Sequence, residues 1–196
     1  MAVDSEKIKT LREMTSAGLM DCKKALEDAG GDLEKAASLL RERGIVKAVK
    51  KMDREASEGQ IFSYVHHNGK IGVLVQLNCE TDFVARTDKF RELGKNIAMH
   101  IAASDPQFIS PEEVSEDVVQ KEREIQRKIL LEEGKSESVI EKILEGKIKK
   151  FKSEICLLEQ AYINDPQLTV GDVIKEAIST LGENIRVARF VRFSMK

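Results

Sequence analysis

The chain of 196 residues contains no tryptophan, only three cysteines and three histidines, and almost no excess of one charge. The cysteines, Cys22, Cys79 and Cys156, are odd in number and far apart, which argues against a disulfide framework and against a zinc site. We therefore expect buried, reduced thiols. The histidines lack the spacing of a metal-binding motif such as HExxH, so no bound metal is expected.

Signs of an active site are also missing. The sequence has no glycine-rich phosphate loop and no GxSxG motif around a nucleophilic serine. Acidic residues occur along the whole chain, so no carboxylate pair stands out as catalytic. We therefore expect a protein that is not an enzyme and that has no cofactor.

The balance of charge and the lack of long apolar runs exclude further classes of protein. The 32 basic and 34 acidic residues give a formal net charge of −2, whereas proteins that bind nucleic acid usually show a clear basic excess. No apolar run is long enough to cross a membrane, and the first residues have no apolar signal-peptide core. We expect a cytoplasmic protein with no direct contact to nucleic acid or membrane.

What the sequence does contain predicts a helix-rich α+β protein. Apolar residues make up 41% of the chain, which is enough for a core, and charged residues make up 34%. Residues 1–45 show three short runs of apolar residues at helical spacing, which predict a three-helix bundle of the ubiquitin-associated type. Asp4 or Ser5 and Asp32 can cap the first and third helices, and Gly44 is expected to end the third.

Two features of this N-terminal region have alternative interpretations. Leu19 and Met20 fall in the first loop between helices, and they are either core residues or exposed contacts for a partner. We favour exposure of at least one, because small domains bury a smaller fraction of their surface. Residues 46–59 carry several basic side chains. They form either a basic helix that binds phosphate or acidic partners, or a solvated helical linker, which we favour.

Residues 60–196 predict an α+β core. Two runs that alternate in hydrophobicity flank Asn68-Gly69, the strongest short signal for a β-hairpin. A last alternating run, Ile185–Phe193, is expected to pair with this hairpin in a small antiparallel sheet. Two apolar stripes at helical spacing within residues 116–150, separated by Gly134, predict a projecting hairpin of two antiparallel helices. This helical hairpin is either self-contained or forms a dimer or partner contact.

The segment Asn78–Arg86 follows the best strand pattern in the sequence and precedes a strong helix pattern. Corners of this kind are often exposed and carry function. Asp82 can cap the helix that follows. Phe83 is either a plug in the core under this helix or a protruding wedge. Packing statistics alone favour the plug, because large apolar side chains are usually buried.

Several segments of this sequence resemble segments of a known protein family and occur in the same order along the chain. They are Leu11-Arg12-Glu13, Ala17–Leu26, Asn78–Arg86, Glu145–Phe151, Leu157–Gln160, Thr169–Gly171 and Val191–Phe193. Together they resemble the elongation factor Ts family, the bacterial nucleotide-exchange partners of elongation factor Tu. This resemblance implies an N-terminal ubiquitin-associated-like bundle, an α+β core and a helical hairpin that projects from the core.

The resemblance reverses the interpretation of Phe83. It implies that a tip enters the GTPase domain of elongation factor Tu in its GDP form, displaces the bound Mg²⁺ and promotes GDP release. The tip residues are Thr81, Asp82, Phe83 and Val84. Bundle residues that would dock on the same domain are Lys9, Leu19, Met20 and Lys23. Because the chain is short for this family and similar to half of a longer member, the resemblance also allows a homodimer.

Two other functions stay open. The three-helix unit can belong to an adaptor that binds a ubiquitin-like or nascent chain, although an adaptor does not need the Asp82-Phe83 corner. The third alternative is an enzyme built on Cys79 with His66 or His67. It would require a cysteine that is accessible and has a depressed pKa.

Overall fold

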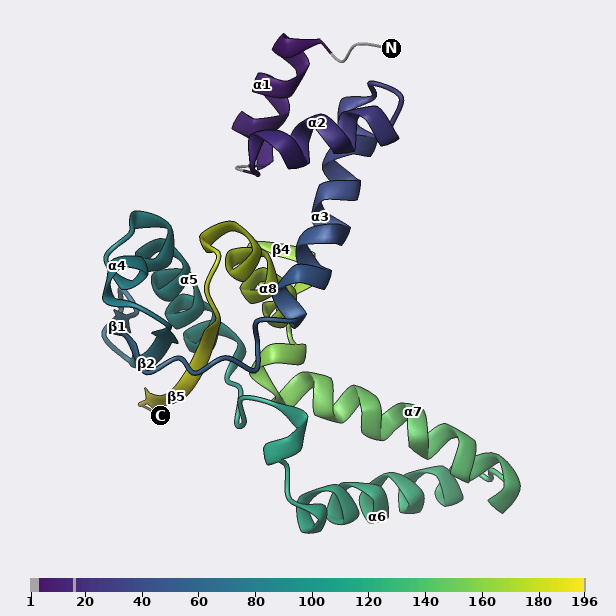
Figure 1. Cartoon of the computed structure of the whole chain (residues 1–196). Coiled ribbons are helices and arrows are strands. Elements are labelled where there is room, and N and C mark those ends of the chain that lie inside the picture. Colours follow the sequence, from purple (N-terminus) through teal and green to yellow (C-terminus); the bar gives the residue numbers. More distant parts are fainter. Residues whose placement is uncertain (1–3, 16, 196) are drawn as a thin grey trace. The chain divides into compact units, whose positions relative to one another are not determined.

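Figure 1 shows the computed structural model, which describes residues 4–15 and 17–195. The helices are α1 (Ser5–Thr15), α2 (Leu19–Asp28), α3 (Leu33–Val49), α4 (Asp82–Ala85), α5 (Asp88–Ser104), α6 (Glu116–Glu132), α7 (Glu137–Ile155) and α8 (Val170–Leu181). The strands are β1 (Glu58–Val65), β2 (Ile71–Cys79), β3 (Ala161–Tyr162), β4 (Asp165–Thr169) and β5 (Ile185–Ser194). Strands and helices do not alternate regularly along the chain, which confirms the predicted α+β class.

The described residues form two compact units that interleave along the sequence. The first unit comprises Met1–Gln60, Leu77–Leu93 and Ile174–Ala188, and the second comprises Ile61–Gln76, Gly94–Val173 and Arg189–Lys196, as far as these ranges are described. None of the described helices is both long enough and apolar enough to cross a membrane.

In the first unit, α1, α2 and α3 confirm the predicted bundle. Its buried core consists of Leu11, Cys22, Ala25, Leu26, Ala36 and Leu40. Asp4 accepts a hydrogen bond from the first turn of α1 at 3.0 Å, and Asp32 accepts one from the first turn of α3 at 3.0 Å. The assignment of Leu19 and Met20 to a loop is wrong, because Gly18 takes the extended N-cap conformation and α2 begins directly after it.

The prediction that Gly44 ends the third helix is also wrong, because α3 continues to Val49. A Cβ atom on Gly44 would lie 2.4 Å from Oγ of Ser179 in α8, so the missing side chain allows α3 and α8 to approach closely. Residues 46–49 are therefore helical, and the chain from there to β1 is not. The division into a bundle at 1–45, a linker at 46–59 and a core at 60–196 stays a prediction.

The sheet has the strand order β1-β2-β5. In the turn between β1 and β2, Gly69 has φ of +70°, a conformation that favours glycine, and the N–H of His66 donates to the carbonyl of Ile71 at 2.8 Å. The N–H of Met195 donates to the carbonyl of Lys70 at 2.9 Å. Because the end of β5 thus meets the start of β2, these strands run antiparallel, as predicted. β3 and β4 form a separate antiparallel pair.

In the second unit, one face of the sheet is covered and the other is not. On the covered face, Phe62 of β1 packs against α5, where a Cβ atom on Gly94 would lie 2.2 Å from the phenyl ring. On the opposite face, large apolar side chains are exposed. The outer sheet face, as we call it, consists of Ile61, Leu74, Val191 and Phe193.

The helices α6 and α7 confirm the predicted helical hairpin. Gly134, with φ of +74°, lies in the turn between them. The buried cluster next to this turn consists of Leu130, Ile140 and Leu144. Arg127 of α6 pairs with Glu137 at 2.8 Å and with Glu141 at 3.0 Å, which joins the two helices on their outer side. α7 extends to Ile155, beyond the predicted end at about residue 150.

His100 is a fully buried titratable side chain in α5. Its Nδ1 atom accepts from the N–H of Ile163 at 3.4 Å, so Nε2 carries the proton and donates to Oε1 of Gln160 at 2.9 Å. The amide nitrogen of Gln160 donates to backbone carbonyls, which fixes the side-chain oxygen toward His100. Burial lowers the pKa of His100, and the hydrogen bond that His100 donates to Gln160 opposes this shift only in part.

We predict that the neutral form of His100 makes the stability depend on pH. Because the folded-state pKa lies below the unfolded value, this contribution is complete above pH 6.5 and is lost as the pH falls further, toward the folded-state pKa. Urea unfolding between about pH 7 and about pH 5 should show the wild-type protein losing more stability than His100→Gln, which does not titrate there. An equal loss in both proteins would contradict this role.

Candidate functional site

The predicted tip forms the start of α4 in the first unit. Thr81 is the N-cap residue, with φ of −130° and ψ of 156°, and its hydroxyl oxygen accepts from the N–H of Val84 at 3.4 Å. The prediction that Asp82 caps this helix is therefore wrong, because the residue before it already binds the free amide. Asp82 lies instead in the first turn, where its negative charge is favourable.

Phe83 points away from the core. Its side chain is 79% exposed, whereas Ala85 of the same turn is buried, so the interpretation of Phe83 as a core plug is wrong. The carboxylate of Asp82 accepts from Nη2 of Arg86 at 2.7 Å, one helical turn later. Val84 is half-buried. A single helical turn directs few side chains toward the core. In α4 the buried side chain is that of Ala85, and the phenyl ring of Phe83 lies in solvent.

Glu183, in the turn between α8 and β5, holds the tip at its base. Its Oε2 atom accepts from the N–H of Thr81 at 3.0 Å, and its Oε1 atom accepts from the hydroxyl of Thr81 at 2.7 Å. Beside this contact, the N–H of Asn184, the residue after Glu183, donates to Oε1 of Glu80, the residue before Thr81, at 2.6 Å. Carboxylates from both segments therefore bind backbone groups of the other, and charge-assisted bonds of this kind are the stronger ones.

The turn that carries Glu183 is itself held to residues after α3. The side-chain amide of the buried Asn184 donates to the carbonyls of Met52 at 2.9 Å and Arg54 at 2.6 Å. Nζ of Lys51 donates to the carbonyl of Gly182 at 2.7 Å. No local pattern in the sequence singles out Glu183, because its partner Thr81 is 102 residues away.

Cys79 lies directly under the tip and is buried. Its thiol donates to the carbonyl of Thr81 at 3.1 Å. Burial, with a smaller effect from the negative charge of Glu183, raises the pKa of Cys79 to about 11. A nucleophilic cysteine needs the opposite shift, so the geometry does not support the enzyme alternative.

The bundle residues of the predicted docking surface are exposed in the same unit. Leu19 and Met20 are 56% and 73% exposed in the first turn of α2. Lys9 on α1 and Lys23 on α2 are also exposed. The structure thus confirms the expected exposure of Leu19 and Met20, while it places these residues on helices rather than in a loop.

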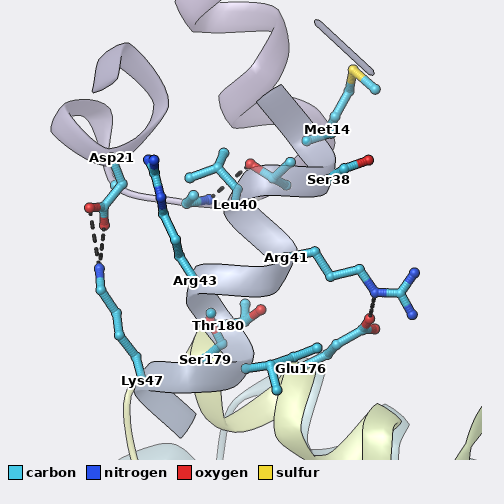
Figure 2. Close-up of a pocket in the computed structure, with 16 residues that line it drawn as sticks. Met14, Asp21, Ser38, Leu40, Arg41, Arg43, Lys47, Glu176, Ser179 and Thr180 are labelled. Atoms are coloured by element: carbon cyan, nitrogen blue, oxygen red, sulfur yellow. Dashed lines mark hydrogen bonds and ion pairs between the residues drawn. The ribbon is translucent and has the colours of Figure 1, made fainter. Parts of the chain in front are cut away.

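A groove of about 520 Å³ in the first unit lies between α3, α8 and the residues that join α1 to α2 (Figure 2). Its basic side chains form the ion pairs Lys47–Asp21, Arg41–Glu176 and Arg43–Asp28. These pairs are substantially exposed, so each stabilises the fold by only about 0–1 kcal/mol. Because the positive charges labelled in Figure 2 are matched within the unit, the groove does not have the character of an anion-binding site.

Metal binding by the chain itself finds no support. Within residues 4–15 and 17–195, no group of three or more histidine, cysteine, aspartate or glutamate side chains is arranged to hold a metal ion. The features that the structure offers for function are an exposed, rigidly held tip and an exposed bundle surface. Both are suited to contact with another protein.

The comparison with known proteins decides the family. The family model described as "Elongation factor TS" matches residues 2–196. The chain belongs to the elongation factor Ts family. A protein named elongation factor Ts from Fervidobacterium nodosum is 56% identical over 195 residues, which cover 100% of this chain and 99% of the relative.

Two further relatives give the same result. Elongation factor Ts from Thermosipho melanesiensis is 57% identical over 193 residues, which cover 98% of each chain. Elongation factor Ts from Nitratidesulfovibrio vulgaris is 54% identical over 195 residues, which cover 100% of this chain and 98% of the relative. The resemblance found in the sequence is confirmed, and family membership supports a role in translation elongation as a nucleotide exchange factor for elongation factor Tu.

We predict that Cys79 does not react with thiol reagents in the folded protein at neutral pH. With a pKa of about 11, only roughly one molecule in ten thousand carries the reactive thiolate at neutral pH. A Cys22→Ser/Cys156→Ser variant isolates this thiol for measurement with an absorbing disulfide reagent, and unfolding in denaturant should release its full reactivity. Rapid labelling of the folded variant would revive the enzyme alternative.

Proposed function

We propose that this chain binds the GDP form of elongation factor Tu and inserts the tip Thr81–Val84 near the bound Mg²⁺. The observation that carries the proposal is the exposure of Phe83 on a turn that Glu183 holds firmly. A single exposed apolar side chain is common and proves little. An exposed ring on a fixed base, in a member of this family, supports a side chain that becomes buried in a partner.

The mechanism of the proposed exchange follows from thermodynamic linkage. GDP with Mg²⁺ and the exchange factor both bind the GTPase, but they favour different conformations of its phosphate site. Coupling is reciprocal, so the factor lowers the affinity for GDP as strongly as GDP lowers the affinity for the factor. Displacement of Mg²⁺ removes a large positive charge from beside the β-phosphate of GDP, which weakens its binding further. No covalent step is required of the chain.

The bundle gives a second contact in this proposal. Leu19 and Met20 offer apolar surface, and Lys9 and Lys23 offer exposed positive charge. These residues dock on the same GTPase domain as the tip, while the C-terminal core contacts the other domains of elongation factor Tu. Contact with nucleic acid or membrane has no part in the proposal.

An adaptor that binds a ubiquitin-like or nascent chain through the bundle is the second candidate. The exposed Leu19 and Met20 suit either function. The tip does not, because an adaptor does not need an exposed phenyl ring on a turn that is held by hydrogen bonds at its base. Family membership also favours exchange.

The proposal predicts that Phe83→Ala slows GDP release but leaves the free protein stable. Loss of an exposed side chain should change the free energy of unfolding by less than about 1 kcal/mol, whereas a core phenylalanine would cost about 3–5 kcal/mol. Asp82→Ala should behave in the same way, because Thr81 keeps the cap, and the exposed ion pair to Arg86 and the favourable charge in the first turn are each worth no more than about 1 kcal/mol. Release of labelled GDP from elongation factor Tu and urea unfolding measure the two quantities.

The control for these variants is Leu131→Ala, which removes an exposed apolar side chain from the end of α6. It should release GDP at the wild-type rate. Normal GDP release by Phe83→Ala would show that the tip is not the part that acts on the nucleotide site.

The homodimer also remains a proposal, and the outer sheet face supports it. Its apolar side chains come from the neighbouring strands β1, β2 and β5, and Ile61 is 65% exposed. An exposed apolar patch can pack against the same patch of a second copy, which is the kind of contact that a twofold-symmetric dimer requires. The alternative contact surface is the helical hairpin of α6 and α7.

Light scattering of two variants distinguishes these surfaces. Ile61→Lys should lower the molar mass in solution from two chains to one, because it places a charge in the middle of an apolar contact. Replacement of residues 116–150 by a short linker should leave the mass at two shortened chains. The reverse pattern would assign the dimer contact to the helical hairpin, and a single-chain mass for the wild-type protein would exclude the homodimer.

A further inference from the structure

The contact between Glu183 and Thr81 uses both oxygens of the carboxylate. Oε2 accepts from the backbone N–H of Thr81 at 3.0 Å, and Oε1 accepts from its hydroxyl at 2.7 Å. The same hydroxyl oxygen accepts from the N–H of Val84 at 3.4 Å. Thr81 therefore connects the carboxylate directly to the first turn of α4, on which Phe83 is carried.

This connection matters because α4 is a single turn that is held only at its two ends. At its C-terminal end the hydroxyl of Thr87 donates to the carbonyl of Val84 at 2.8 Å, and at its start Thr81 binds Glu183. An isolated helical turn is unstable in water, since the order that it imposes is costly and it forms few hydrogen bonds. Phe83 is exposed and adds no packing energy, and only Ala85 of this turn is buried. The direction in which the phenyl ring points is consequently set by the residue at the base of the turn and by what binds that residue.

Glu183 is well placed to set that direction, because its own backbone is fixed. The residue before it, Gly182, has φ of +83° and its carbonyl accepts from Nζ of Lys51. The residue after it, Asn184, is buried and donates to two carbonyls in the segment that follows α3. A carboxylate on a backbone that is fixed in this way holds Thr81 in one place. A carboxylate on a mobile loop would instead move together with Thr81.

We propose that Glu183 is a positioning residue for nucleotide exchange: its two hydrogen bonds to Thr81 fix the orientation in which Phe83 and Asp82 meet the GTPase. This inference rests on the proposed function of the tip. Glu183 acts through Thr81 and does not itself contact nucleotide or metal. Its removal leaves the turn free to take other orientations, so that only a fraction of molecules present the ring correctly.

The test measures release of labelled GDP from elongation factor Tu at saturating factor, for Glu183→Ala, Glu183→Gln and Phe83→Ala. Small misplacements of acting groups slow a reaction by one to two orders of magnitude, so Glu183→Ala should slow release roughly tenfold. Glu183→Gln should recover most of the rate. Its amide oxygen can still accept from the N–H of Thr81, and its NH₂ group can donate to the hydroxyl oxygen. The matched control is Glu113→Ala, which removes a carboxylate that accepts from the N–H of Ile109 at 2.8 Å in the second unit.

A double variant separates positioning from general damage to the fold. If Glu183 acts only by orienting the tip, Glu183→Ala/Phe83→Ala should release GDP no more slowly than Phe83→Ala alone, because the ring to be oriented is absent. A general loss of stability would slow the double variant further. Should Glu183→Ala fail to fold, Glu183→Asp takes its place in the same comparison, because it keeps the charge but shortens the side chain by one methylene group and leaves the cap by Thr81 intact.

The outcomes for the two proposals are distinct. A slow Phe83→Ala with a normal Glu183→Ala overturns the positioning role and keeps the function of the tip. Additive losses in the double variant overturn the positioning role as well. A normal rate for Phe83→Ala overturns the proposed function of the tip itself, whatever Glu183→Ala does.

Discussion

The first unit depends on one network in which three distant segments of the chain hold each other by hydrogen bonds. The segments are 51–54, 80–81 and 182–184, and their joining side chains are Glu80, Glu183 and Asn184. Each of these side chains binds backbone groups of another segment. The network thus supplies hydrogen bonds to the backbone in places where the strand β2 and the helices α3 and α8 have ended. Most of these bonds are half-buried, and each contributes about 0.5–1.5 kcal/mol, or about 1.5–3 kcal/mol where the acceptor is a carboxylate. The tip projects from this fixed point.

Most of the elements could be predicted from the sequence, because each has a local cause. The alternating apolar residues around Asn68-Gly69 predict the β-hairpin, and the structure shows the physical reason, because Gly69 adopts a positive φ in the turn. Gly44 marks the limit of this approach. A glycine after a helical stripe usually ends a helix, and Gly31, with φ of +83°, behaves in this way. Gly44 instead makes room for Ser179, which is 135 residues away along the chain, and no local pattern tells these two uses of glycine apart.

The site was less predictable from the residues alone. The position of the tip followed from the change of pattern after β2, but packing statistics favoured a buried Phe83, and only the family resemblance reversed that interpretation. The side chain is exposed because the one inward position of the turn belongs to Ala85. The partner of Thr81 could not be predicted for a physical reason. Glu183 lies in the turn after α8, where the sequence shows only an ordinary turn signal, and its contact with Thr81 forms when β5 pairs with β2.

The magnitudes of these effects assign different parts to the tip and the bundle in the proposed exchange. Burial of one phenylalanine contributes about 1.5–3 kcal/mol, which is similar to a coupling free energy of about 1–3 kcal/mol between two ligands of one protein. In the proposed exchange, burial of the ring in only one of the two states of the GTPase would thus supply a coupling free energy of the usual size. Contacts of Leu19 and Met20 that form equally well in both states cannot shift that equilibrium, however strong they are. In our proposal these contacts set the affinity of the complex, whereas the orientation of Phe83 sets how much of the binding free energy acts on the nucleotide site.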